Sequence, residues 1–89
     1  MNSVEVEIMD IAQEECAEVV VAISKIHRFG IDNYKPGKPK TNREHLEEEI
    51  GDLVCMFDLM REKGLIRWDN VIDASEKKRE KLRTWSNIL

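Results

Sequence analysis

The amino-acid sequence predicts a single all-α domain, residues 1–89, with three main helices. Three observations favour this fold class: charged residues make up 36% of the chain and apolar residues 42%, there are only four glycines and two prolines, and apolar residues recur at helical spacing. This composition is too apolar for a disordered tail and too poor in turn residues for an all-β sandwich. A chain of this size buries only about 64% of its extended surface, so we expect a partner chain to complete the core.

The first helix is expected from about Ser3 to Phe29. Asn2 and Glu5 have the spacing of a capping box, and Gly30 follows the last apolar position of the helix. Residues 30–40 contain both prolines and two of the glycines, so this segment is expected to be a loop.

The second helix is expected to begin after Thr41, which forms a capping box with Glu44, and to run to about Lys63. Gly64 and the apolar Leu65 after it are typical of a Schellman-type helix end. The sequence therefore marks both ends of this helix.

The third helix is expected from about Asp69 to Ser86, with Val71, Leu82 and Trp85 on one face. Three helices of this length leave long apolar stripes without a partner inside one chain. We therefore expect a four-helix-bundle type of core, completed by the other subunits of a homodimer or homotetramer.

Charge and cysteine usage exclude several classes of protein. The formal net charge of −4 argues against binding a nucleic-acid polymer, and no apolar run approaches the length of a membrane span. The start of the chain contains Glu5, Glu7 and Asp10, unlike a signal peptide. Cys16 and Cys55 fit no disulfide or metal spacing, so a reduced, cytoplasmic protein is expected.

Two acidic pairs interrupt the apolar stripes of the first two helices. On a helical wheel Glu15 lies in the middle of the first stripe, and Glu18 lies about 60° to one side. Glu49 and Asp52 repeat this arrangement on the second helix. Antiparallel packing of these two helices through their stripes would therefore bring four carboxylates together.

Four carboxylates that are buried together need compensation, since desolvation and repulsion disfavour their ionised forms. Protonation is one solution, and a Mg²⁺ or Mn²⁺ ion held by hard oxygen ligands is a better one. Phosphate oxygens commonly complete such a metal shell, which points to metal-assisted chemistry on a phosphorylated substrate. A solvated acidic face, or salt bridges between chains, is the alternative reading.

The segments Glu14-Glu15-Cys16-Ala17-Glu18 and Glu49-Ile50-Gly51-Asp52-Leu53 resemble the paired E-E-x-x-E and E-x-x-D signature of the MazG-like, all-α nucleoside triphosphate pyrophosphohydrolases. The resemblance implies a helical dimer or tetramer that binds Mg²⁺ and cleaves a nucleoside triphosphate to the monophosphate and pyrophosphate. It also implies that the metal ligands are Glu15, Glu18, Glu49 and Asp52. Glu14 would then either support the ligands from outside the metal shell or assist in activating the attacking water.

Other residues are candidates for contacts with the substrate. Lys78 and Lys81, near the apolar stripe of the third helix, would reach phosphates, or else form a solvated basic helix end. Tyr34, in the loop between the first two helices, would read the base. His45 lies one turn before Glu49, where it either touches the site or is partly exposed.

The sequence departs from the family pattern in two places. Thirty residues separate Glu18 from Glu49, slightly more than is usual, and the basic segment 77–83 lacks the asparagine that relatives often have there. These departures concern the contacts to phosphate and sugar more than the metal ligands. Three alternatives stay open: a dUTP-specific hydrolase, a phosphoribosyl-ATP type of hydrolase, and a non-catalytic helical interaction module.

Overall fold

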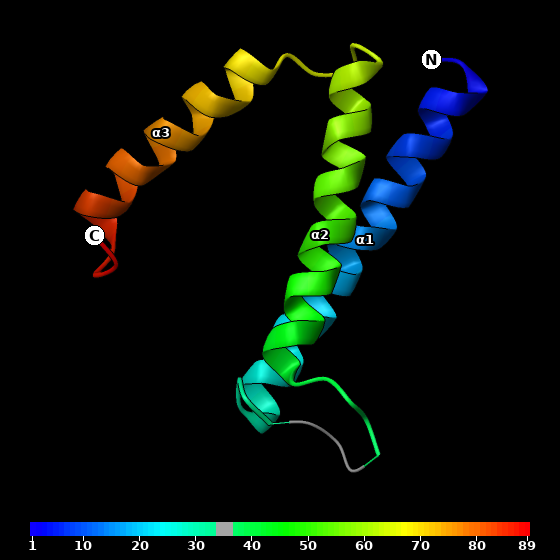
Figure 1. Cartoon of the computed structure of the whole chain (residues 1–89). Helices are drawn as coiled ribbons and strands as arrows, with labels where there is room; N and C mark the ends of the chain where they lie inside the picture. Colours follow the sequence, from blue (N-terminus) through cyan, green and yellow to red (C-terminus); the bar gives the residue numbers. More distant parts are fainter. Residues whose placement is uncertain (34–36) are drawn as a thin grey trace.

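The computed structural model of the chain describes residues 1–33 and 37–89, and it confirms the all-α fold class. Its three helices are α1 (Ser3–Phe29), α2 (Asn42–Glu62) and α3 (Trp68–Trp85), and no strand occurs in the described part of the chain. Helices α1 and α2 lie side by side as an antiparallel hairpin, while α3 points away from them (Figure 1). The hairpin is therefore the part of the fold that positions the candidate site.

Both helices of the hairpin begin with the capping boxes that the sequence predicts. The Asn2 side chain accepts a hydrogen bond from the Glu5 backbone N–H, and Thr41 accepts one from the backbone N–H of Glu44. Each glutamate side chain in turn accepts a hydrogen bond from the backbone N–H of its cap residue. These bonds satisfy donors that lack a partner inside the helix and fix the first turn of each helix.

The end of α2 forms the expected Schellman motif. The Leu65 N–H donates to the Met60 carbonyl at 2.9 Å, and the Gly64 N–H donates to the Arg61 carbonyl at 3.0 Å. Gly64 has a φ of +72°, which costs little in a residue without a Cβ. The motif therefore ends α2 sharply.

Helix α3 begins one residue earlier than the sequence suggests, at Trp68. Its cap residue, Arg67, makes no side-chain capping hydrogen bond, so this helix start lacks the capping signal that marks the starts of α1 and α2. The Arg61 guanidinium lies over the Trp68 ring, 5.3 Å from its centroid, which links the end of α2 to the start of α3.

The loop between α1 and α2 is tied to the start of α2. The backbone N–H groups of Asn42 and Arg43 donate to the carbonyls of Asn33 and Ile31, at 2.9 and 2.8 Å. The Arg43 side chain also pairs with Asp32, with 3.0 Å between Nε and Oδ1. These bonds hold the two ends of the hairpin connection together.

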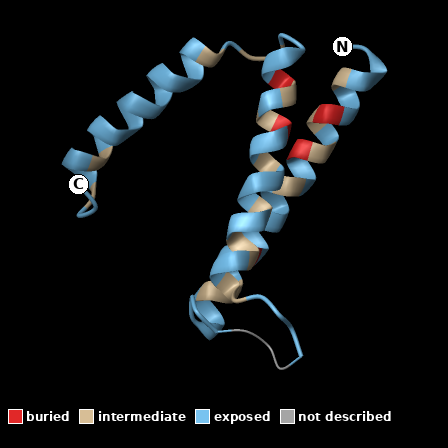
Figure 2. Cartoon of the chain, in the orientation of Figure 1, coloured by how far each residue is buried: buried red, intermediate tan, exposed pale blue. Residues whose placement is uncertain are grey.

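The core is small and lies between α1 and α2 (Figure 2). Ile8 and Ala12 of α1 pack with Met56 and Met60 of α2, and all four residues are at most 9% exposed. This cluster lies toward the N-terminal end of α1 and the C-terminal end of α2, and partly buried apolar residues surround it. The expected pairing of the two stripes is thereby confirmed.

Helix α3 contributes no buried residue to this core. The radius of gyration of the chain is 16.1 Å, against about 12 Å for a compact domain of this length. Trp85 is 84% exposed. One chain alone thus builds a two-helix core with an extended third helix.

Candidate metal centre

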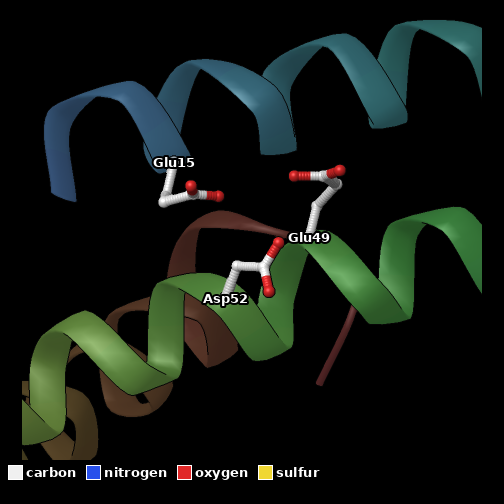
Figure 3. A group of neighbouring side chains, drawn as sticks. All are labelled: Glu15, Glu49 and Asp52. Atoms are coloured by element: carbon white, nitrogen blue, oxygen red, sulfur yellow. The ribbon is translucent and has the colours of Figure 1, made fainter. Parts of the chain in front are cut away.

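Three of the predicted carboxylates come together between the two helices of the hairpin. Glu15 projects from α1, and Glu49 and Asp52 project from α2 toward it (Figure 3). Each residue offers a carboxylate oxygen, and these three oxygens all lie within 4.8 Å of one another. The i, i+3 spacing puts Glu49 and Asp52 on neighbouring turns of one helix face, which explains how a single helix supplies both.

Glu15 is the most constrained member of this cluster. Its Oε2 atom is buried and has no hydrogen-bond partner. Desolvation raises the pKa of Glu15 above its ordinary value, and the negative charges of Asp52, Glu49, Glu18 and Glu14 raise this pKa further. A nearby positive charge would therefore stabilise the ionised form of Glu15.

The donor set fits a hard divalent cation. Three carboxylate oxygens within one small volume are the kind of ligands that Mg²⁺ and Mn²⁺ prefer. The unpartnered oxygen of Glu15 supplies a further argument, because a buried acceptor without a donor is costly and a cation would satisfy it. Carboxylates from facing helices are also a common way of building metal sites in helical bundles.

His45 borders the cluster, one turn before Glu49 on α2. Its Nε2 lies 3.3 Å from Oε1 of Glu49, and the side chains of these residues are 29% and 14% exposed. The structure thus favours the reading in which this histidine touches the site. The sequence offers only its i, i+4 spacing from Glu49 as a signal.

Glu18 and Glu14 lie on α1 beside the cluster rather than within it. Both residues are exposed, and neither belongs to the group of three oxygens. Their negative charges nevertheless act on Glu15, and that of Glu18 acts more strongly than that of Glu14. The negative charge of Glu18 therefore acts on the site, but its carboxylate is not one of the three whose oxygens lie close together.

The two lysines that are predicted to contact the substrate lie farther away. Lys78 and Lys81 are exposed residues of α3, which points away from the hairpin, so a single chain does not bring them to the carboxylates. Tyr34 lies outside the residues that the structure describes.

A cleft of about 640 Å³ lies at the end of the hairpin that carries the α1–α2 loop. Its lining includes His45, which also touches Glu49, and three lysines, Lys25, Lys38 and Lys40. Lys40 pairs with Glu48, which lowers the pKa of Glu48 and raises that of Lys40. Sequence reasoning missed Lys25, whose only signal is that it is the first basic residue of α1.

Two negative findings concern other kinds of site. In the described part of the chain, no helix is long and apolar enough to cross a membrane. Cys16 and Cys55 are both free and exposed. The cysteines therefore form no disulfide with each other.

Comparison with known proteins identifies the family. Neither the curated proteins nor the solved structures give a significant match to this chain. The MazG nucleotide pyrophosphohydrolase domain, however, matches residues 5–84, which is nearly the whole chain. This match covers α2 completely, all but the outermost residues of α1 and α3, and every carboxylate of the candidate metal centre. With its all-α fold and its paired acidic motifs, the chain belongs to the MazG nucleotide pyrophosphohydrolase family.

Proposed function

We propose that this protein is a Mg²⁺-dependent nucleoside triphosphate pyrophosphohydrolase. In the proposed reaction the oxygen of water bonds to the α-phosphorus, and the bond from this phosphorus to its bridging oxygen breaks. The products are the nucleoside monophosphate and pyrophosphate. The observation that supports this function most is the cluster of Glu15, Glu49 and Asp52, because its three close carboxylate oxygens suit a metal that binds polyphosphate.

The carboxylates of this chain would have two roles, binding the metal ion and accepting a proton from water. Glu15, Glu49 and Asp52 would hold Mg²⁺, or Mn²⁺ in its place, and Glu18 would complete the ligand set from the next turn of α1. When bound, the cation supplies Lewis acidity and neutralises phosphate charge. Glu14 is exposed beside the cluster, where it would accept the proton that the attacking water loses.

Basic side chains near the carboxylates support a polyanionic substrate. Lys25 and Lys38 line the cleft next to His45, where their ammonium groups would attract phosphates. Lys78 and Lys81 would reach the substrate from α3, and Tyr34 would contact the base. The contacts from Lys78 and Lys81 need a packing of α3 that the hairpin of a single chain does not supply.

We further propose that the 89 residues form one domain that works in the cytoplasm as a homodimer or homotetramer. Two features support this setting. The free cysteines agree with a reducing compartment, and a two-helix core of this size agrees with stabilisation by other subunits.

A nucleotide panel tests the proposed activity. Purified protein is incubated with canonical, deoxy and modified triphosphates, with and without Mg²⁺, and the products are separated by ion-exchange chromatography. We expect equal amounts of monophosphate and pyrophosphate from at least one triphosphate, only when Mg²⁺ is present. Release of inorganic phosphate and a diphosphate would contradict attack at the α-phosphorus, and no turnover of any substrate would contradict the activity.

A further inference from the structure

The cleft at the loop end of the hairpin adjoins the candidate metal centre. Its lining includes three lysines as well as His45 and Glu48. His45 also contacts Glu49, with 3.3 Å between Nε2 of the histidine and Oε1 of the glutamate. A group that is bound at the carboxylates therefore has the basic side chains of the cleft within its surroundings.

Helical geometry places the cleft and the metal centre on the same side of the hairpin. Counting about 100° per residue, Glu48 and Asp52 lie about 100° and 60° from Glu49 in one rotational sense. On α1, Lys25 lies about 80° from Glu15 in the same sense. Equal rotation places residues on the same side of an antiparallel pair. The acidic centre and the basic cleft are therefore successive parts of one surface.

Lys40 is the lysine of this cleft that the structure links to the metal centre. Its Nζ atom pairs with Oε2 of Glu48. The Glu48 side chain raises the pKa of Lys40 most, through a hydrogen bond and its negative charge, and the charges of Glu44 and Asp52 raise this pKa further. The ammonium group of Lys40 thus lies within electrostatic range of a carboxylate of the metal centre.

The pair between Lys40 and Glu48 is of a kind that opens readily. The two side chains are 52% and 49% exposed, and exposed ion pairs contribute little to stability because water solvates both charges. A polyphosphate that enters the cleft carries several negative charges. The ammonium group therefore gains more from phosphate oxygens than it loses by leaving a single carboxylate.

We propose that Lys40 binds a phosphate group of the substrate and that Glu48 holds this lysine until the substrate arrives. On binding, the ammonium group exchanges the Glu48 carboxylate for phosphate oxygens, and the carboxylate returns to water. Glu48 thus competes with the substrate for Lys40. The inference rests on the proposed function, because it assumes that polyphosphate is bound at the carboxylates.

Calorimetric titration with the Mg²⁺ complex of inorganic tripolyphosphate measures this contact without requiring a known base. Lys40→Gln should weaken binding by about tenfold or more, which corresponds to the loss of one charge-assisted hydrogen bond. Lys63→Gln, which changes an exposed lysine at the opposite end of α2, should bind as the wild type does. Equal affinities of Lys40→Gln and the wild type, or no binding by the wild type, would overturn the proposal.

Glu48→Gln tests the exchange itself, because this substitution should improve binding. Tripolyphosphate affinity should rise by about two- to fivefold, the range that corresponds to breaking an exposed ion pair. The same substitution should have little effect when Lys40→Gln is already present. Glu47→Gln removes the same charge from the neighbouring residue and should change the affinity less. Equal gains from Glu48→Gln with and without Lys40 would overturn the exchange, because total charge alone would then explain them.

Titration with Mn²⁺ in the absence of phosphate separates substrate binding from support of the metal centre. Lys40→Gln should bind Mn²⁺ at least as tightly as the wild type, since it removes a cation near the carboxylates. Weaker Mn²⁺ binding would mean that Lys40 supports the metal centre and would contradict its assignment to the substrate.

The nucleotide panel distinguishes failure of this inference from failure of the proposed function. If no triphosphate is cleaved but the Lys40 and Glu48 variants change tripolyphosphate binding as expected, the activity is wrong and the exchange stands. If triphosphates are cleaved and Lys40→Gln changes neither KM nor tripolyphosphate affinity, the activity stands and the exchange is wrong.

Discussion

The position of Glu15 is the residue-scale feature on which the proposed chemistry depends. A carboxylate in the middle of an apolar stripe conflicts with the packing that the rest of the stripe favours. The structure shows the cost of this position. The Oε2 atom of Glu15 is buried without a hydrogen-bond partner, and the pKa of Glu15 is raised. Such conflicts between local pattern and global fold are expected where residues serve function rather than folding.

Glu15→Gln is expected to stabilise the metal-free protein. Because the folded-state pKa of Glu15 is raised, the folded chain binds more protons than the unfolded chain at a pH between the two pKa values, and stability falls as pH rises through that window. In EDTA at pH 7 the variant should therefore melt at a higher temperature than the wild type. The difference should vanish as the pH falls below 4.5, the ordinary pKa of this group.

The control for this experiment is Glu47→Gln, which changes an exposed glutamate on α2. It should leave the melting temperature at pH 7 nearly unchanged. Adding Mn²⁺ should raise the melting temperature of the wild type and have little effect on Glu15→Gln. A lower melting temperature for metal-free Glu15→Gln would contradict the view that this carboxylate is strained.

Sequence spacing alone could predict much of the cluster, and the reason is geometric. Helical periodicity determines the side on which Glu15, Glu49 and Asp52 lie, and antiparallel pairing then brings them together. The contact between His45 and Glu49 depends on side-chain orientation, which spacing leaves open. The position of Lys25 in the cleft depends on the path of the loop.

At the scale of elements, the helix starts that were predicted well are those with capping side chains. Asn2 and Thr41 form hydrogen bonds within four residues of chain, so their sequence context is sufficient to identify them. The start of α3 is predicted only as near Asp69, one residue after the observed start, because Arg67 makes no side-chain capping hydrogen bond that would mark it. The direction of α3 depends on contacts beyond its own sequence, which local patterns do not encode.

Thr41→Ala is expected to destabilise the protein by about 1 kcal/mol, because the Glu44 backbone N–H loses its side-chain acceptor. The matched control is Thr84→Ala, which changes an exposed threonine in the last turns of α3 and should alter stability by less than about 0.5 kcal/mol. Urea denaturation followed by circular dichroism measures both. Equal stability of Thr41→Ala and the wild type would show that the cap does not support α2.

At the scale of the whole molecule, the chain is a helical hairpin followed by a third helix, α3, that contributes no buried residue. The expected pairing of α1 with α2 is confirmed, and it accounts for every residue of the main buried cluster. The four-helix core expected from the exposed stripes needs more helices than this hairpin supplies, so it depends on the other subunits of the proposed homodimer or homotetramer.

Calorimetric titration with Mn²⁺ tests the central claim most directly, because it measures the carboxylate cluster without requiring a known substrate. The wild type should bind Mn²⁺. Glu49→Gln should weaken this binding by more than about 100-fold, the upper end of the loss expected for removing only an outer hydrogen-bond partner of a metal ligand. The exposed control Glu47→Gln should bind as the wild type does. Equal affinities of the wild type and Glu49→Gln, or no binding by the wild type, would contradict a metal centre at Glu15, Glu49 and Asp52.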